Sequence, residues 1–255
     1  MTVESSAPPS SSGDGWQPVA RARTYELVID AIEEQILAGT LRVGDALPPE
    51  RELAARLQVS RPAVREALRV LEAQGVLRSA TGSGAGAGTF VAAMPGEALS
   101  RFLRLHIALA NFELAEIIEA RVTLECSSVA LAARATDPER LVDVRAAMAR
   151  MEANDTDREQ FNDDDTAFHT AIAEAGGNRL VTALTVAIRN ALRASILDAF
   201  QEIDDWSALR DELMVEHRAI LAAIEAGDAS RASHLAEQHI RDSYERLPLL
   251  HGTRD

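Results

Sequence analysis

One aspartate and three of the six histidines lie where their side chains could hold a cation. Asp165 and His169 are four residues apart on an expected helix and so share one face. His217 and His239 each fall on the apolar face of a later expected helix. Burying imidazoles and a carboxylate together costs free energy unless they are paired. A divalent ion such as Zn²⁺ or Ni²⁺ would pair them, and so would a hydrogen-bonded Asp–His network; the spacing leaves both open.

A second charged pair falls in the middle of an apolar face. The expected helix 112–134 places Arg121 and Glu125 among aliphatic residues. A buried arginine without a partner is very costly. Arg121 therefore forms an ion pair with Glu125 one turn away, or it grips the carboxylate of an anionic ligand through two parallel hydrogen bonds.

A stripe of arginines predicts a different chemistry nearer the N-terminus. Arg61, Arg65 and Arg69 recur every fourth residue on an expected helix 61–74, opposite a buried apolar face. The preceding helix, 48–57, is joined to it by a tight turn, which is the arrangement of a helix-turn-helix. The first residues of such a second helix point at base edges in the major groove. Arg61 and Arg65 are the expected base or phosphate contacts, and Arg51 is placed to hold a phosphate.

Further elements complete that arrangement. A helix over 25–38 ends at Gly39, and residues 41–47 form a short extended connection. Two short strands, 76–78 and 89–91, flank a glycine-rich loop over 79–88, which predicts a wing. An isolated stripe of arginines is more often an ordinary surface helix; the whole set of elements favours DNA binding.

After Glu97 the sequence shows only helical periodicity, separated by proline, glycine and Asx breakers. The expected fold is mainly α: a winged helix-turn-helix followed by an antiparallel bundle of about seven helices. The expected divisions are a tail over 1–18, a DNA-binding domain over 19–92, a linker over 93–96, a helical domain over 97–248 and a tail over 249–255. The expected helices of the second domain are 97–109, 112–134, 138–153, 158–175, 178–202, 206–226 and 229–247.

Composition limits the setting. The net charge is −14, but residues 1–91 hold nine arginines against 11 acidic residues, so most of the acidity lies in the second half. One cysteine, Cys126, excludes an intramolecular disulfide and favours a reducing compartment. No apolar run reaches 18 residues, so we expect a soluble cytoplasmic protein without a membrane segment.

The N-terminal motifs resemble the GntR family of bacterial regulators. The resemblance covers about residues 20–92 and rests on the runs LPPERELA from Leu47, VSRPAVREAL from Val59, LEAQGVL from Leu71 and GAGTFV from Gly86. It implies a homodimer that binds a palindromic double-stranded operator. The positions that match the family's DNA contacts are Arg51, Ser60, Arg61, Pro62, Arg65, Gly86 and Gly88. The wing departs from the family pattern, because it is long and lacks a basic residue before Gly86.

The helical half is similar to the FCD ligand-binding domain of the FadR-type subfamily. The resemblance implies that Asp165, His169, His217 and His239 bind a divalent metal, zinc or nickel, and that Arg121 points into the effector cavity. The resulting hypothesis is a transcriptional repressor, not an enzyme, whose operator affinity is controlled by a small organic acid bound beside the metal. A regulator with a purely structural metal and a metal-dependent hydrolase with an attached DNA-binding domain are the alternatives.

Overall fold

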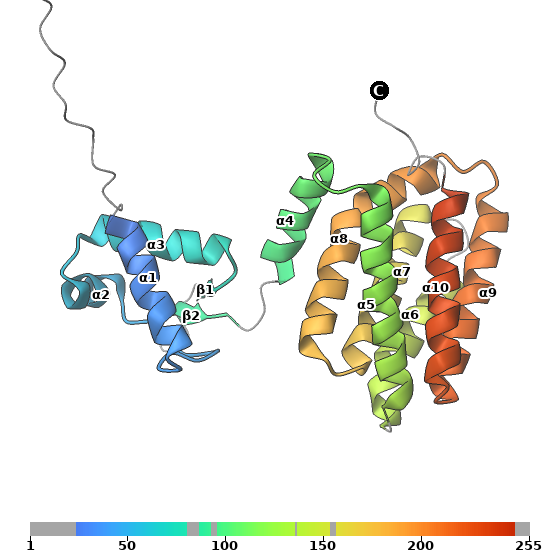
Figure 1. Ribbon diagram of the computed structural model, residues 1–255, viewed down its shortest axis with the longest axis horizontal. Helices are drawn as coiled ribbons and strands as arrows, with labels where there is room; N and C mark the ends of the chain where they lie inside the picture. Colours follow the sequence, from blue (N-terminus) through green and yellow to red (C-terminus); the bar gives the residue numbers. More distant parts are fainter. Residues whose placement is uncertain (1–23, 81–86, 93–95, 136, 154–156, 248–255) are drawn as a thin grey trace, which may run out of the picture. The chain divides into compact units, whose positions relative to one another are not determined.

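Figure 1 shows a computed structural model of the chain, which describes residues 24–80, 87–92, 96–135, 137–153 and 157–247. Contacts divide the chain into two compact units, one reaching Arg42 and resuming over Pro48–Arg69, the other made of Val43–Leu47 and the residues from Val70 onward. The domain limits expected from the sequence stay a prediction, because this division assigns the hairpin differently.

The N-terminal elements follow the expected order. Helix α1 spans Thr24–Leu37, α2 spans Glu50–Leu57 and α3 spans Arg61–Ala73. Between α2 and α3 the chain turns at Gln58, which adopts a left-handed conformation with φ 54°. The hydroxyl of Ser60 accepts a 3.4 Å hydrogen bond from the backbone N–H of Ala63, so Ser60 serves as the N-cap of α3.

The wing is a two-stranded antiparallel hairpin. Strand β1, Leu77–Ala80, pairs with β2, Gly88–Val91, in a register that places Ala80 opposite Gly88. The strands are longer than expected, because Ser79, Ala80 and Gly88 also pair, although the glycine-rich sequence predicted a loop over 79–88. The expected extended connection is present as well: Ala46 forms an isolated antiparallel bridge with Phe90. Gly86 lies outside the described residues.

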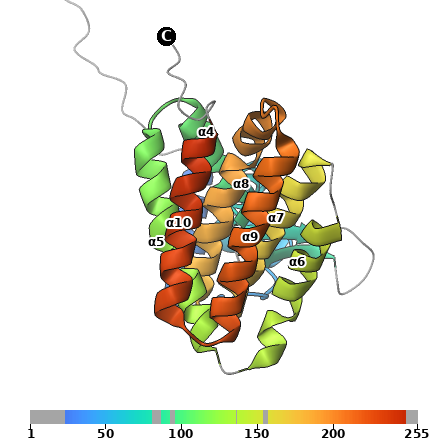
Figure 2. The same cartoon turned by 90° about the vertical axis from the view of Figure 1, so that its right-hand side faces the viewer.

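The rest of the described chain folds into seven α-helices, which Figures 1 and 2 show as ribbons. Their bounds are Gly96–Ala108 (α4), Leu114–Arg134 (α5), Val142–Ala153 (α6), Arg158–Ala175 (α7), Arg179–Gln201 (α8), Trp206–Glu225 (α9) and Ala229–Arg246 (α10). In Figure 2, α9 and α10 lie in front of α7 and α8, with α5 and α6 at the edges. Helix α7 contacts α5, α6 and α8, and α5 contacts α7, α8, α9 and α10.

Asx residues fix where the long helices begin. The side chains of Asp157, Asn178, Asp205 and Asp228 each accept hydrogen bonds from backbone N–H groups in the first turn of α7, α8, α9 and α10. These caps satisfy donors that have no partner within the helix. They hold the helices in the register that brings Asp165, on α7, into the interior of the bundle.

Two helix starts differ from the sequence expectation. The expected helix 138–153 begins with a 3-10 turn over Pro138–Leu141, because Pro138 lacks an N–H and Asp137 caps the N–H of Glu139. The expected helix 112–134 begins at Leu114, because Glu113 occupies the N-cap position and its backbone N–H donates to the Glu116 carboxylate.

The connection between α7 and α8 depends on a close approach. A Cβ atom at Gly176 would lie 2.9 Å from the Cβ of Leu131 and 3.2 Å from the carbonyl oxygen of Ser128, both on α5. Gly177 follows with φ +72°, a conformation that suits glycine. The end of α7 therefore touches the α5 backbone at a position where no side chain fits.

Helix α8 is long and apolar enough to cross a membrane, by length and composition only. One 18-residue window in Arg179–Gln201 has a mean hydropathy of 1.4 and passes the length and composition test for a span. The helix nevertheless carries Arg189 and Arg193 near its middle and packs against α4, α5 and α7. Both observations agree with a core helix of the bundle.

Candidate metal centre and nucleic-acid interface

Four side chains converge inside the bundle as the sequence predicted. Asp165 and His169 come from α7, His217 from α9 and His239 from α10. One ligand atom from each lies within 4.8 Å of all the others. The three histidines are at most 4% exposed. The structure thus brings together residues separated by up to 74 positions in the chain.

The spacing of the donor atoms fits a small divalent ion. The two Nε2 atoms of His169 and His217 are 3.3 Å apart, and the Asp165 Oδ1 lies 3.0 Å from the His217 Nε2 and 3.7 Å from the His169 Nε2. Around a tetrahedral Zn²⁺ with bonds of about 2.1 Å, neighbouring ligands are separated by about 3.4 Å. Three imidazole nitrogens and one carboxylate oxygen are a donor set that zinc and nickel both accept.

Electrostatics keep the donors in the forms that bind metals. Burial and the nearby Arg189 lower the pKa of His169 to about 3, so the ring is neutral near pH 7. Burial also lowers the pKa of His239, and His217 adds to that effect. Burial by itself raises the pKa of Asp165, but Arg189 and His217 outweigh it and hold the pKa well below its usual range. Asp165 is therefore an anion beside the neutral rings of His169 and His239.

A hydrogen-bonded network accounts for only part of this arrangement. The His169 Nδ1 lies 2.9 Å from Glu125, and the His239 Nδ1 lies 2.7 Å from Glu216, so both Nδ1 atoms have a carboxylate acceptor. A ring protonated at Nδ1 presents an unshared electron pair at Nε2. The pair on His169 faces Asp165 and His217, and a cation is a partner that suits this set of donors.

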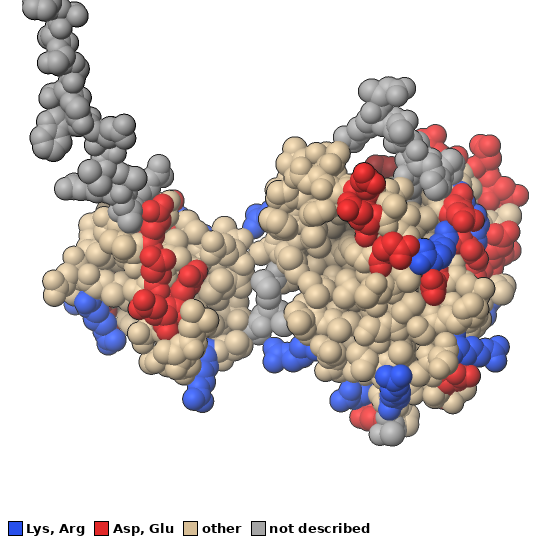
Figure 3. Space-filling view, in the orientation of Figure 1, with Lys and Arg blue, Asp and Glu red and all other residues tan. Residues whose placement is uncertain are grey.

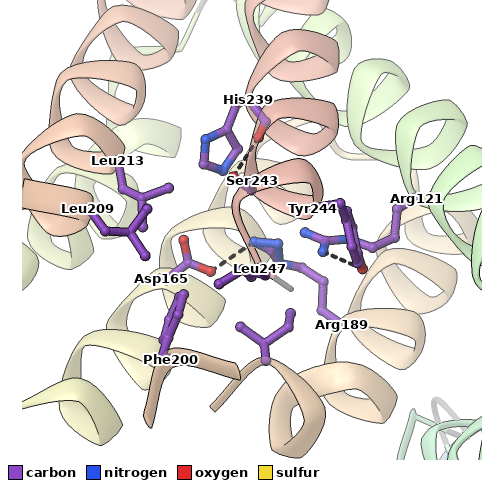
Figure 4. A pocket seen from close by; sticks show the side chains of 11 residues that line it. Arg121, Asp165, Arg189, Phe200, Leu209, Leu213, His239, Ser243, Tyr244 and Leu247 are labelled. Carbon is purple, nitrogen blue, oxygen red and sulfur yellow. Dashed lines mark hydrogen bonds and ion pairs between the residues drawn. The ribbon is translucent and has the colours of Figure 1, made fainter. Parts of the chain in front are cut away.

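Arg121 is paired inside the protein and also faces a cavity. Its Nε donates to Glu125 at 2.8 Å and its guanidinium donates to the Tyr244 hydroxyl at 3.0 Å. Burial alone lowers the pKa of Arg121, but Glu125 and Tyr244 raise it above its ordinary value. Figure 4 shows Arg121 beside Tyr244 at the edge of the cavity. The ion pair with Glu125 is therefore present and Arg121 lines a cavity, whereas its contact with an effector carboxylate stays a prediction.

The sequence reasoning missed Arg189. This side chain on α8 is 4% exposed and donates to Asp165 at 3.1 Å and to both oxygens of Glu125 at 3.3 Å. It also lines the cavity with Arg121 and His239, and its Nε is buried without a hydrogen-bond partner among the described residues. An arginine among apolar residues near the middle of α8 is the sequence signal that could have found it.

The cavity itself is small and mostly apolar. It measures about 30 Å³, enough for one or two water molecules. Figure 4 shows Asp165 and His239 on one side and the two arginines on the other. The walls between them are the aliphatic and aromatic side chains of Ile196, Phe200, Leu209, Leu213 and Leu247.

The predicted DNA contacts on α2 and α3 are exposed. Arg51, Ser60, Arg61, Pro62 and Arg65 all have accessible side chains, whereas Val64 and Leu71 on the opposite face of α3 are fully buried. Arg65 is held by Glu50 at the start of α2, with an N–O distance of 2.8 Å and half of the arginine side chain accessible. The hydrogen bond from Arg65 lowers the pKa of Glu50. Gly88 begins β2 with φ +148°.

Charge is distributed unevenly over the surface in Figure 3. In this view the bundle carries acidic side chains over its right-hand part, around α9 and α10. The exposed carboxylates there include Glu212 and Asp242, which flank Arg246. That face is unsuited to a polyanion, so we look for DNA contacts on α3 instead.

Sequence comparisons identify both parts of the chain. A model of "Bacterial regulatory proteins, gntR family" matches residues 24–87, and a model of the FCD domain matches residues 116–242. The HTH-type transcriptional repressor NanR of Cronobacter sakazakii is 30% identical over 238 residues, covering 90% of this chain and 87% of the relative. The uncharacterized HTH-type transcriptional regulator YcbG of Bacillus subtilis is 32% identical, covering 88% of this chain and 89% of the relative.

Solved structures share the fold. The Streptococcus agalactiae GntR structure matches 86% of this chain and 98% of its own, with a TM-score of 0.56 and 23% sequence identity. The curated relatives are HTH-type transcriptional regulators rather than enzymes, which argues against the hydrolase alternative. The chain belongs to the GntR family of bacterial transcriptional regulators, with an N-terminal helix-turn-helix and a C-terminal FCD domain.

Proposed function

We propose that this regulator is a repressor whose affinity for a palindromic operator is controlled by a small carboxylate bound beside a divalent metal. The carrying observation is the convergence of Asp165, His169, His217 and His239 next to a cavity lined by two buried arginines. The FCD match and the curated repressors among the relatives support this reading. A transcriptional regulator of this kind acts in the cytoplasm.

The metal would be held by the three Nε2 atoms and an Asp165 oxygen, and zinc or nickel fits this set. When bound, it supplies a Lewis acid with coordination positions open to a carboxylate or hydroxyl group. Arg121 and Arg189 would meet the same anion from the other side of the cavity. Two buried arginines and a metal would attract an anion electrostatically, which the apolar walls of the cavity would not.

The small cavity supports a conformational response. A space of about 30 Å³ is tight for a multi-carbon acid, and we expect such a ligand to bind better to a bundle whose lining side chains have moved apart. It would then shift the population toward that state. The separation of the two operator-binding helices in a homodimer would then change, and operator affinity with it.

Self-association has a candidate surface along α4 and the segment that follows it. Phe102 and Leu105 on α4 and Leu109 just after it are each more than half exposed, and Phe112 follows at 39%. Contiguous exposed apolar side chains are typical of protein contacts. The stripe begins beside Arg101 and Arg104 and ends beside Glu113 and Glu116, so an antiparallel pairing with a second copy places opposite charges together.

Sedimentation or light scattering tests the dimer. The wild type is expected to be dimeric, and Leu105→Glu with Leu109→Glu is expected to shift it to monomer. Val215→Glu, a substitution of an exposed apolar residue on α9, is the matched control. Dimers that persist in the α4 variant would reject this surface.

Operator binding and metal content test the central proposal. Purified protein is analysed for metal and titrated with DNA from its own upstream region, with and without candidate acids. We expect one zinc or nickel ion per chain, and an acid that weakens DNA binding in the wild type but not in Arg121→Met. If chelation lowers only the melting temperature while the acid still acts, the metal is purely structural. A protein that binds no divalent ion contradicts the metal proposal.

A further inference from the structure

The three histidines of the cluster differ in what their Nδ1 atoms contact. The His169 Nδ1 faces Glu125 and the His239 Nδ1 faces Glu216, at 2.9 Å and 2.7 Å. The His217 Nδ1 is buried without a hydrogen-bond partner among the described residues. A carboxylate on Nδ1 keeps the proton there, fixes the orientation of the ring and makes Nε2 a better metal ligand. The rings of His169 and His239 are thus each oriented by a carboxylate at Nδ1.

The two orienting carboxylates have very different surroundings. Glu125 is 2% exposed and also accepts hydrogen bonds from Arg121 and Arg189. Glu216 is about one-quarter exposed at its side chain and pairs with Arg246. Arg121 and Arg189 line the cavity, whereas Arg246 does not. Of these two carboxylates, only Glu125 therefore connects a histidine of the cluster to the cations that face the cavity.

We propose that Glu125 is a positioning residue that couples cation binding at His169 to anion binding at Arg121 and Arg189. This inference rests on the proposed function, because it requires a metal at the histidine cluster. Glu125 has one negative charge to share among two guanidinium groups and an imidazole. Any anion that draws Arg121 away leaves more of that charge to the imidazole N–H, which strengthens His169 as a ligand.

The coupling works in both directions. If an anion in the cavity raises the affinity for the metal, the metal raises the affinity for the anion by the same factor. A direct bond between anion and metal would also couple the two sites, but it would not pass through Glu125. The two routes are separated by removing the charge of Glu125 while keeping its shape.

The first measurement uses Zn²⁺ alone, in competition with a chromophoric chelator, on the full chain. Glu125→Gln and Glu216→Gln are each expected to weaken Zn²⁺ binding about 10–100-fold, the usual effect of removing an outer partner of a metal ligand. Arg121→Met is expected to strengthen Zn²⁺ binding in the wild-type background and to do so much less in the Glu125→Gln background. In the matched cycle, Arg121→Met acts equally with and without Glu216→Gln.

A spectroscopic readout separates positioning from simple loss of structure. In ¹⁵N-labelled protein, the Nδ1–H resonance of His169 is expected to move upfield in Glu125→Gln, while that of His239 stays in place. The Co²⁺-loaded variant is expected to show an altered visible absorption spectrum. A variant that is only less stable would change neither signal in its folded fraction.

The outcomes are distinguishable. If Glu125→Gln does not fold, the comparison is made between Arg121→Met and Arg121→Met with Glu125→Gln, because the pair removes one charge of each sign. Equal Zn²⁺ affinity of these two proteins, or identical effects of Arg121→Met in both backgrounds, overturns the role of Glu125. A wild type that binds no Zn²⁺, Ni²⁺ or Co²⁺ overturns the proposed function itself.

Discussion

Arginine side chains occupy opposite environments in the two regions of this molecule, exposed on α3 and buried in the helical bundle. On α3, Arg65 and Arg69 have side chains that are 50% and 69% exposed, with single glutamate partners at the surface. In the bundle, Arg121 and Arg189 are 6% and 3% exposed; Arg121 pairs with Glu125, and Arg189 pairs with Glu125 and Asp165. Exposed arginines exchange solvent or a weak partner for a phosphate at little cost. Buried arginines give up a partner only to a ligand that replaces it, which makes them selective.

The largest expected effect is the loss of stability on removing a buried arginine from the bundle. Arg189→Met leaves Glu125 and Asp165 without their shared cation, and we expect it to lower the free energy of unfolding by about 3–5 kcal/mol. Arg193→Met, one turn further along α8, removes a half-exposed pair with Asp163 and should lower it by less than about 1 kcal/mol. Denaturant titration measures both. Equal losses would show that burial does not distinguish these arginines.

The next effect concerns the DNA side. Arg61→Ala and Arg65→Ala are each expected to weaken specific operator binding by about 1–3 kcal/mol, as for a lost bidentate base contact. Their melting temperatures should match the wild type, because both side chains are exposed. Fluorescence anisotropy at fixed salt gives the affinities. Full affinity of both variants would remove α3 from the interface.

Ser60→Asp separates capping from DNA contact. Aspartate caps a helix as well as serine does, so stability should change by less than about 0.5 kcal/mol. The added negative charge at the exposed start of α3 should weaken DNA binding by about 1 kcal/mol or more. Ser60→Asn, an uncharged cap, is the control for both measurements. A Ser60→Asp protein with unchanged affinity would place this end of α3 away from the phosphates.

The smallest expected effect is that of Glu50→Gln. The Glu50–Arg65 pair is exposed, so its loss should change stability by less than about 1 kcal/mol. Unrelated DNA should bind somewhat more tightly, because a negative charge near the phosphates is gone. A salt titration against random-sequence DNA measures this. Weaker binding to random DNA would instead mean that Glu50 holds Arg65 in place for phosphate contact.

The sequence predicted more of the elements than of their connections. The Asx caps and glycine breakers place most helix ends within two residues, since these signals are local. The four metal-ligand candidates could also be predicted, because His217 and His239 lie on apolar faces, where a polar side chain is costly unless it has a partner. Glu216 could not be found that way: it is adjacent to His217 in sequence but is bonded to His239, on another helix.

Arg189 shows the other limit of sequence reasoning. Its two carboxylate partners come from α5 and α7, so nothing within its own helix indicates which charges surround it. The role of Arg121 was left between two alternatives for the same reason. Periodicity tells which face of a helix is buried, whereas the partner across the interface depends on how the helices are arranged.

The close contact at Gly176 leaves no room for a side chain between α7 and α5. An alanine there would place its methyl carbon 2.9 Å from the Cβ of Leu131 and push α7 off α5. Glu125 lies one turn before Ser128 on α5, and His169 two turns before Gly176 on α7, so their 2.9 Å contact would open together with that gap. A single methyl group, two turns of α7 away from His169, is therefore expected to disturb the geometry of the histidine cluster.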